Sequence, residues 1–389
     1  MNAGQKVRVA LADDTALYRK ILSMAVEKIP SAELVGVAVD GVAAVEVVKN
    51  KSVDLFLLDV CMPRMDGVEA LRKIHELSPS TAVVMFSGVT SADAETTVEA
   101  LEIGALEFIP KPKTNSLDES MSLLAQELNR VVRLLKIRQI HKRISASPSA
   151  RTTERPAPGA AGVASSAASR PVASVGTGRV GVVRRFVNFD AHRSLIVIGV
   201  STGGPNALNQ LMCMLPKRLG CPVLIVQHMP PFFTASLASF LSKKSGLDVV
   251  EATHGELMQA DRIYIAPGGK HMEIRKRTDA MGGYEITTNE AAPVNSCRPS
   301  VDVLFQSVAS EFSGSILSII LTGMGEDGCQ GVTTLRRSPS TYTIAQNEES
   351  CVVYGMPRAI VERGLADEVL PLDQIAGRIS ELVLKRKVS

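Results

Sequence analysis

The chain contains no tryptophan, and aromatic residues make up only 4% of its 389 residues. We therefore do not expect an aromatic stacking platform for single-stranded nucleic acid. The chain also lacks a strong excess of either charge, because 43 Lys and Arg face 40 Asp and Glu and leave a net charge of +3. This balance argues against a protein whose main task is to coat nucleic acid.

Cysteine pairs and long apolar runs are missing as well. The six cysteines form no C-x-x-C pair, so no zinc-knuckle or thioredoxin-type motif is visible. The most apolar segments, 195–200 and 316–321, are far shorter than the roughly 20 residues of a membrane helix. The N-terminal residues contain no apolar signal segment. We therefore expect a cytoplasmic protein that does not insert into a membrane.

Two regions of the sequence alternate short apolar runs with helical segments. In the first region, the strand-like runs cover 7–12, 34–39, 53–60, 81–87 and 105–109. In the second, they cover 194–200, 223–227, 262–266, 315–321 and 342–345, and a hairpin is expected around Gly282-Gly283. Strands that alternate with helices indicate a parallel sheet covered by helices on both faces. The sequence thus predicts two doubly wound α/β domains.

The segment between these regions has a different composition. It is rich in Ala, Ser, Pro, Gly and Arg and has no periodic apolar stripe, which is typical of a flexible linker. A basic, amphipathic stretch at 130–143 precedes it, and we interpret this stretch as a terminal helix with a solvated face, with a docking surface as the alternative. The predicted domains are 1–130 and 191–389, with the basic helix and a disordered linker over 131–190.

Acidic residues gather at the predicted strand ends of the first domain. Asp13 and Asp14 follow the first strand, and Asp59 ends the third. Carboxylates that meet at one sheet edge suit a hard cation such as Mg²⁺. Ser87 and Lys111 end the fourth and fifth strands and can contact a phosphoryl group. Asp14 alone would fit a helix cap, but the five residues together indicate a site for phosphoryl transfer.

These residues lie in segments that resemble the response-regulator receiver domain: Leu11–Asp14, Leu57–Gly67, Ser87-Gly88 and Lys111-Pro112. The resemblance covers about residues 5–125 and implies a flavodoxin-like fold with Asp59 as the phosphoacceptor. It implies that Asp13, Asp14, Asp59 and the backbone carbonyl of Cys61 bind Mg²⁺, and that Ser87 and Lys111 contact the phosphoryl group. It places Phe108 at the switch aromatic position. Cys61 departs from the often acidic residue of the family, which leaves its side chain without an expected role.

The second domain contains a serine in a glycine-rich turn. Ser201 lies in Gly199–Gly204, after an apolar strand and before a helix that begins near Pro205. Such a turn exposes a hydroxyl beside backbone N–H groups, although similar turns also bind phosphate. His228 follows the next strand and is the favoured base, whereas His254 and His271 are expected at the surface. Asp327 follows a third strand as the orienting acid, with Glu326 as its rival.

The second region resembles the CheB chemotaxis methylesterase family over about residues 194–385. The resemblance rests on Gly199–Pro205, Gln227–Pro230, Ala266–His271, Arg298–Asp302, Leu321–Gly328, Ala345–Asn347 and Gly355–Pro357. It implies a Rossmann-like esterase with a Ser201, His228 and Asp327 triad and an oxyanion hole from backbone N–H groups near Thr202 and Met324. It further implies demethylation of glutamate methyl esters and deamidation of glutamines on chemoreceptors, controlled by phosphorylation. The linker is long for this family.

The resemblance also implies the partners and cofactors. A chemotaxis histidine kinase would supply the phosphoryl group, methyl-accepting chemoreceptors would be the protein substrates, and Mg²⁺ would serve the receiver only, with no cofactor for the esterase. Two other classes were open from the residues. A DNA-binding response regulator would need a basic helix-turn-helix after the linker, where strands and a serine turn are found instead. An inactive adaptor would keep the fold and lose the triad geometry.

Overall fold

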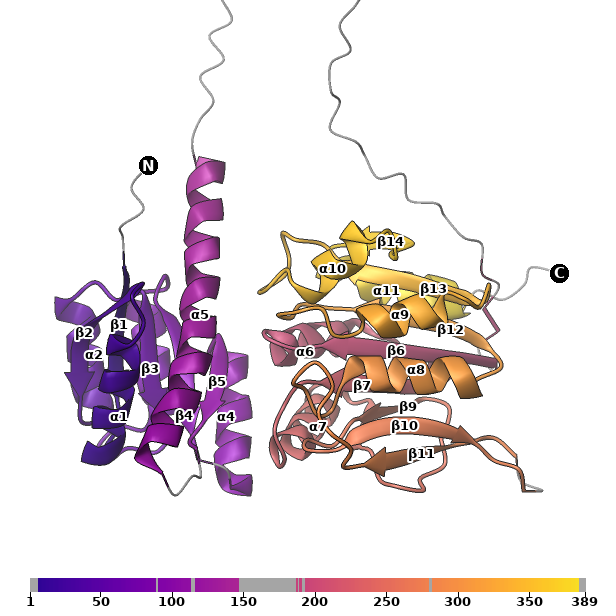
Figure 1. Cartoon of the computed structure of the whole chain (residues 1–389), viewed down its shortest axis with the longest axis horizontal. Coiled ribbons are helices and arrows are strands. Elements are labelled where there is room, and N and C mark those ends of the chain that lie inside the picture. Colours follow the sequence, from indigo (N-terminus) through magenta and orange to yellow (C-terminus); the bar gives the residue numbers. More distant parts are fainter. Residues whose placement is uncertain are drawn as a thin grey trace, which may run out of the picture.

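Figure 1 shows the computed structural model of the chain, which describes residues 6–88, 90–112, 116–146, 187, 189–190, 193–279 and 282–384. Two α/β domains lie side by side, each with its own sheet. The predicted flexible linker lies outside the described residues from 147 to 186. Among the described helices, none combines the length and apolar character needed to cross a bilayer.

The N-terminal domain has a five-stranded parallel sheet in the order β2-β1-β3-β4-β5. Its strands are β1 (Val7–Ala12), β2 (Ala32–Ala38), β3 (Leu55–Asp59), β4 (Ala82–Ser87) and β5 (Glu107–Pro110). Its helices are α1 (Ala16–Glu27), α2 (Gly41–Asn50), α3 (Gly67–Leu77), α4 (Ser91–Ile103) and α5 (Leu117–Ala146). The predicted boundary at residue 130 falls inside α5, which continues the domain well beyond the sheet.

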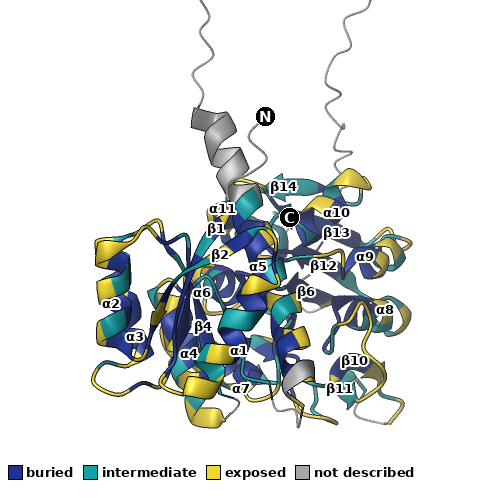
Figure 2. Cartoon of the chain, turned by 60° about the vertical axis from the view of Figure 1, so that its left-hand side comes forward, coloured by how far each residue is buried: buried dark blue, intermediate teal, exposed yellow. Residues whose placement is uncertain are grey.

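Side chains of the central strands point alternately to the two faces of this sheet, and apolar side chains on both faces explain why helices cover both. In β3, Phe56 and Leu58 pack with α2, α3 and α4, while Leu55 and Leu57 pack with α1 and α5. Successive side chains of a strand point to opposite faces, so a fully apolar strand needs two helical layers. Figure 2 shows the result, with buried residues along the sheets and exposed residues on the outward faces of helices such as α2.

The C-terminal domain has a seven-stranded parallel sheet in the order β14-β13-β12-β6-β7-β9-β8. Its strands are β6 (Ser194–Val200), β7 (Val223–Gln227), β8 (Asp248–Glu251), β9 (Arg262–Ile265), β12 (Ser315–Ile320), β13 (Thr341–Gln346) and β14 (Glu368–Leu370). The helices are α6 (Gly204–Met214), α7 (Phe233–Ser245), α8 (Val301–Glu311), α9 (Cys329–Leu335), α10 (Met356–Glu362) and α11 (Leu372–Leu384). A separate antiparallel hairpin, β10 (His271–Lys276) with β11 (Tyr284–Asn289), agrees with the hairpin expected around Gly282-Gly283.

In the second sheet, too, alternate side chains of each strand pack against different helical layers. Ile196 and Ile198 of β6 pack on the side of α6, α7 and α11, whereas Leu195 and Val197 pack on the side of α8, α9 and α10. All seven residues of β6 are buried, as expected for a central parallel strand. The predicted fold class of two doubly wound parallel-sheet domains is confirmed. The sequence analysis missed β8, β14, α9 and α10, whose three to seven residues are too short for a clear periodic signal.

The two domains share an apolar interface. Helix α4 packs against α6 and α7, and the ring of Phe108 in β5 stacks on Phe233 of α7 with 4.3 Å between centroids. Glu102 of α4 pairs with Lys244 of α7 at 2.6 Å. Apolar side chains of both domains form one continuous buried cluster there. The α4 and β5 side of the first domain is therefore covered by the second domain.

Candidate functional site

The serine turn lies at the carboxyl end of the central strand β6. Ser201 directly follows β6, its N–H donates to the Thr322 carbonyl at 3.0 Å, and its own carbonyl accepts from the Gln227 amide at 3.0 Å. Gly203 has φ +77°, a left-handed conformation that glycine adopts without strain, and it begins α6 as the N-cap. A side-chain carbon at this position would come within 2.4 Å of Val352. The turn therefore requires glycine both for its backbone and for its packing.

The backbone after β12 runs directly against this serine. A Cβ atom on Gly323 would lie 2.8 Å from the Ser201 Cβ, so the loop carrying Met324 approaches the turn as closely as a glycine permits. Thr322 fixes the loop because its hydroxyl donates to the Thr202 carbonyl at 3.0 Å. Thr202 and Met324, whose N–H groups were predicted to form an oxyanion hole, thus belong to two loops tied together beside Ser201.

His228 and Asp327 meet from the loops after β7 and β12, the two strands that flank β6. His228 follows β7, which pairs in parallel with β6, and its N–H donates to the carbonyl of Val200, the residue before Ser201. Its imidazole Nε2 lies 2.8 Å from Asp327 Oδ2, and its Nδ1 lies 3.5 Å from the Cys297 sulfur. Both imidazole nitrogens therefore have partners, and no hydrogen bond joins His228 to the Ser201 hydroxyl among the described residues.

Asp327 is buried, and its carboxylate lies at the N-terminus of α8. Its carboxylate accepts hydrogen bonds from the N–H groups of Val301 (2.7 Å) and Asp302 (3.2 Å), as expected of an anion at a helix start. The Ser300 hydroxyl and the Asn295 amide each donate to Oδ1 at 2.8 Å. Burial opposes the charge, but the hydrogen bonds from His228, Asn295 and Val301 outweigh it and lower the pKa of Asp327 to about 2.

The pKa of His228 is shifted in the opposite direction to that of Asp327. Burial alone would lower the pKa of His228, but hydrogen bonds with Asp327 and with the Cys297 thiol raise it to about 9. These contacts therefore favour the protonated imidazole in this covered form. The rival acid Glu326 does not reach the histidine, because its carboxylate is exposed and pairs with Arg363 at 2.5 Å.

Several residues of this cluster were missed by the sequence analysis. Asn295 and Cys297 lie in a loop whose residues gave no strand, helix or motif signal, and Asn295 adopts φ +52° while bridging Asp302 and Asp327. The expectation that His271 lies at the surface is wrong. The residue is 1% exposed, and its ring is held between the Ala292 carbonyl and the Ser300 N–H, beneath this loop. His254 is exposed, as expected.

Helix α5 of the first domain reaches the serine turn. Arg130 Nη1 donates to the Thr202 hydroxyl at 2.7 Å and lies 3.8 Å from Glu107 of β5. Burial raises the pKa of Glu107, while Arg130 and a hydrogen bond from Thr202 oppose this shift. Burial also opposes the charge of Arg130, but Glu107, Glu127 and Cys297 raise its pKa. The residue after the serine is therefore fastened to the other domain by a charged hydrogen bond.

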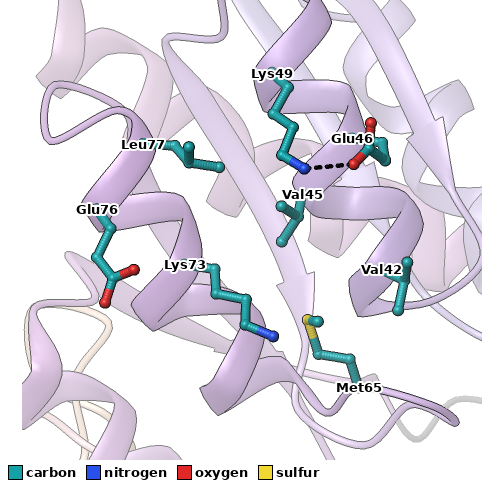
Figure 3. A pocket seen from close by; sticks show the side chains of 8 residues that line it. All are labelled: Val42, Val45, Glu46, Lys49, Met65, Lys73, Glu76 and Leu77. Atoms are coloured by element: carbon teal, nitrogen blue, oxygen red, sulfur yellow. Dashed lines mark hydrogen bonds and ion pairs between the residues drawn. The ribbon is translucent and has the colours of Figure 1, made fainter.

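Two hollows accompany these sites. A cavity of about 820 Å³ adjoins Met324 and is lined by the loops after β12 and β13, by α10, and by Leu134 of α5. Its charged lining residues are Glu326, Glu348, Arg358, Glu362 and Arg363. A smaller hollow of about 390 Å³ lies between α2 and α3, where Figure 3 shows Val42, Val45, Met65 and Leu77 with charged neighbours. None of its lining residues belongs to either predicted site.

The acidic cluster lies at the carboxyl edge of the first sheet, where β1 and β3 are neighbours. Asp13, Asp14 and Asp59 place one carboxylate oxygen each within 4.8 Å of one another. Lys111 Nζ lies 2.9 Å from Asp13 and 2.8 Å from Asp59. Burial, reinforced by Asp13 and Asp14 and opposed by Lys111, raises the pKa of Asp59 to about 6. Negative charge in this cluster therefore exceeds what Lys111 neutralises.

The surroundings of this cluster place the remaining predicted residues. Gly67 is required beside Asp59, because a Cβ there would lie 2.0 Å from the Asp59 carbonyl oxygen. Ser87 is fully buried and its hydroxyl is engaged by Thr97 at 2.7 Å. The Cys61 side chain points to Asp93, with 3.8 Å between sulfur and oxygen. The sequence-predicted phosphoryl contacts thus lie at adjacent strand ends, with Lys111 alone paired to Asp59.

Comparison with known proteins agrees with this architecture. The response regulator receiver domain family matches residues 9–121, and the CheB methylesterase family matches residues 196–379. The chain therefore joins a receiver domain to a CheB methylesterase domain.

Full-length relatives specify the family. A protein-glutamate methylesterase/protein-glutamine glutaminase of Desulfotalea psychrophila is 39% identical, covering 97% of this chain and 99% of its own. One of Symbiobacterium thermophilum is 39% identical, covering 97% of each chain. The crystal structure of the Thermotoga maritima CheB methylesterase catalytic domain is 39% identical over 49% of this chain and 98% of its own, with a TM-score of 0.46. The chain belongs to the CheB family of protein-glutamate methylesterases/protein-glutamine glutaminases, and the predicted family is confirmed.

Proposed function

We propose that this chain is a phosphorylation-activated serine esterase that demethylates glutamate methyl esters, and deamidates glutamines, on methyl-accepting chemoreceptors. The observation that supports it most directly is the pairing of His228 with Asp327 beside the serine turn. The substrate class rests on the names of the relatives, which are protein-glutamate methylesterases/protein-glutamine glutaminases over nearly the whole chain.

The geometry suggests which imidazole nitrogen acts as the base. Asp327 holds Nε2 and stabilises the charge that forms on the ring, so Nδ1 is the nitrogen left to accept a proton. Cys297 occupies Nδ1 in this structure, and it must give way before Nδ1 accepts the Ser201 proton. The covered arrangement is therefore a resting state, in which Cys297 contacts Nδ1 and His228 does not yet contact the serine hydroxyl.

The reaction then follows from these positions. His228 takes the Ser201 proton, and the serine oxygen attacks the ester carbonyl to form a tetrahedral intermediate. N–H groups at Thr202 and Met324 would stabilise the oxyanion. The bond to the methoxy group breaks, His228 returns the proton, and methanol leaves a glutamyl-enzyme. Water, deprotonated by His228, releases the glutamate carboxylate; with glutamine as substrate, ammonia leaves instead of methanol.

Contacts between the domains suggest how phosphorylation controls the reaction. Arg130 fastens Thr202, Phe108 stacks on Phe233, and Leu134 lines the cavity beside Met324. We infer that the cavity receives the chemoreceptor segment and that the receiver restricts access to it. Phosphorylation of Asp59 adds about −1.5 to −2 charges at the carboxyl edge of the sheet. Asp59 pairs there with Lys111, which follows β5, and the resulting shift of β5 and α4 would weaken the interface.

The acidic cluster has the donors that Mg²⁺ requires. Its carboxylate oxygens are close together, and their charge exceeds that of Lys111. Asp13, Asp14, Asp59 and the Cys61 carbonyl would hold the ion, which would neutralise charge on the incoming phosphoryl group. Lys111 already pairs with Asp59 and would hold a phosphoryl oxygen, while the Ser87 hydroxyl would donate to another. A histidine kinase of the chemotaxis system is the proposed phosphodonor.

The test is release of methanol from methylated chemoreceptor by the full chain, with and without acetyl phosphate and Mg²⁺. We expect slow release without the phosphodonor and faster release with it. An inactive adaptor would release no methanol under either condition. A serine-directed organophosphate that labels Ser201 in the activated protein would distinguish a competent nucleophile from a misassembled one.

A further inference from the structure

The Cys297 thiol is placed against His228 with the geometry of two metal ligands. The sulfur lies 3.5 Å from Nδ1. A Zn–S bond of about 2.3 Å and a Zn–N bond of about 2.0–2.1 Å, set at a tetrahedral angle, separate sulfur and nitrogen by about 3.5 Å. The two atoms therefore need little movement to share one tetrahedral zinc ion.

The second ring nitrogen of His228, Nε2, also has the contact expected of a histidine that binds a metal. Histidines that bind a metal usually donate their second ring N–H to a carboxylate, which fixes the ring and raises its basicity. His228 makes this contact with Asp327 at 2.8 Å, and Asp327 is itself held by Asn295 and Ser300. Together His228, Cys297 and Asp327 form one of the two groups among the described residues whose side chains are close enough to surround a metal ion.

We propose that Cys297 and His228 Nδ1 form an inhibitory site for a soft divalent cation such as Zn²⁺. Thiolate and imidazole ligands select such ions over Mg²⁺. Binding releases two protons to solvent: the Cys297 thiol loses its proton as the metal–sulfur bond forms, and a protonated His228 loses the proton on Nδ1 as the metal–nitrogen bond forms. The ion then occupies the Nδ1 lone pair that would accept the Ser201 proton. Because only two side chains bind the ion directly, water completes the coordination and a chelator removes the metal.

The receiver domain makes this site dependent on the activation state. Arg130 lies at the serine turn, where it donates to the Thr202 hydroxyl at 2.7 Å, and Cys297 is among the groups that raise its pKa. A positive charge beside the thiol opposes a divalent cation. When the receiver moves away, Arg130 leaves with α5, and the metal site strengthens as the esterase becomes active. Zinc therefore inhibits the activated form in preference to the covered one.

Binding is tested first, by titrating the reduced full chain with Co²⁺ in excess Mg²⁺, which occupies the acidic cluster. We expect a thiolate-to-cobalt charge-transfer absorption that disappears in Cys297→Ser and in His228→Gln. The matched control is Cys213→Ser, which removes an exposed thiol of α6 that contacts Asn209 and no histidine. An unchanged absorption in Cys297→Ser, or its loss in Cys213→Ser, would overturn the proposal. Arg130→Ala is expected to bind Co²⁺ more tightly, and equal affinity would contradict the part assigned to Arg130.

Inhibition is tested next on the acetyl phosphate-activated chain, with each variant compared with its own zinc-free rate of methanol release. Loss of a partner that only supports a metal ligand typically lowers metal affinity by about 10- to 100-fold, so loss of the direct ligand in Cys297→Ser should raise the Zn²⁺ needed for half inhibition at least about tenfold. Equal sensitivity would contradict the proposal. The inference rests on the proposed function only through His228 as the base. The two failures are distinguishable, because cobalt binding to Ser201→Ala reports the metal site even when no methanol is released.

Discussion

Both domains place a buried aspartate at the carboxyl edge of a parallel sheet, yet the surroundings shift the two carboxyls in opposite directions. Asp59 lies among carboxylates with one lysine, and burial raises its pKa to about 6. Asp327 is also buried, but hydrogen bonds lower its pKa to about 2. The receiver site thus holds negative charge that needs a further cation, whereas hydrogen bonds to both carboxylate oxygens stabilise the charge of Asp327. The first is suited to a reversible change, and the second to a fixed geometry.

The contrast between the two sites depends first on the esterase site carrying out the hydrolysis. Ser201→Ala removes the proposed nucleophile while leaving the fold unchanged. Methanol release from methylated receptor should fall by at least about 10⁴-fold, as when a triad nucleophile is removed. Ser310→Ala, an exposed serine on α8 of the same domain, should retain the full rate. Comparable rates in the two variants would assign the reaction to another group.

Substitutions of two adjacent residues test which acid orients His228 in the esterase site. Asp327→Asn keeps the shape but loses the charge that holds the His228 proton, so the rate should fall about 10³- to 10⁴-fold. Glu326→Gln changes a carboxylate that is 63% exposed and pairs with Arg363, so it should alter the rate by less than about threefold. Methanol release by both variants under activating conditions decides between the two acids. A larger loss in Glu326→Gln would reverse the assignment.

How much of this was visible in the sequence differs between the two domains. In the receiver, each predicted site residue lies at a strand end, and strand ends can be predicted from apolar runs such as Leu55–Asp59. The esterase site also uses Asn295 and Cys297, which belong to a loop without periodicity or motif. Their partners are 32 and 69 residues away in the sequence, so only tertiary folding brings them together.

The contacts between domains were the hardest part to predict. Arg130 stands in a basic helix whose charges are typical of a solvated face, and nothing local indicates a partner 72 residues further along the chain. His271 illustrates the same limit, because its turn-rich neighbourhood suggested exposure although the following loop covers it. Local patterns thus predicted the two sheets, while the surfaces joining them depend on which faces meet.

Activation through the receiver site should be lost when its phosphoacceptor is removed. Asp59→Asn replaces the attacking carboxylate by an amide, so acetyl phosphate should no longer stimulate methanol release. Removing Mg²⁺ with a chelator should have the same effect on the unchanged chain, because the acidic cluster would keep its unbalanced charge. The slow basal rate should remain in both experiments. Stimulation of Asp59→Asn by the phosphodonor would contradict the role of Asp59 as the switch.

The link between the two sites is Arg130. Arg130→Ala removes a charged hydrogen bond to Thr202, which contributes about 1.5–3 kcal/mol, so the balance between covered and open forms should shift by about tenfold or more. Basal methanol release should rise without a phosphodonor. The control is Arg133→Ala, which lies one turn along α5 and is exposed. If both variants kept the basal rate, the covered state would have to depend on the apolar contacts alone.

The smallest expected effect is on the pH dependence of basal methanol release, which reports the pKa of His228 in the covered form. The pKa of His228 is raised from 6.5 to about 9 in the covered form, so the neutral base becomes available only as the pH rises through that value. Basal methanol release should therefore increase with pH up to about 9. The hydrogen bond with Asp327 is the largest single cause that raises this pKa, and the hydrogen bond with the Cys297 thiol comes next. Cys297→Ala should therefore move the midpoint of the profile to lower pH. Rates of methanol release across pH, together with NMR titration of the imidazole, measure this midpoint. An unchanged midpoint in Cys297→Ala would mean that the thiol does not control the resting histidine, and that Asp327 alone sets the proton affinity of the base.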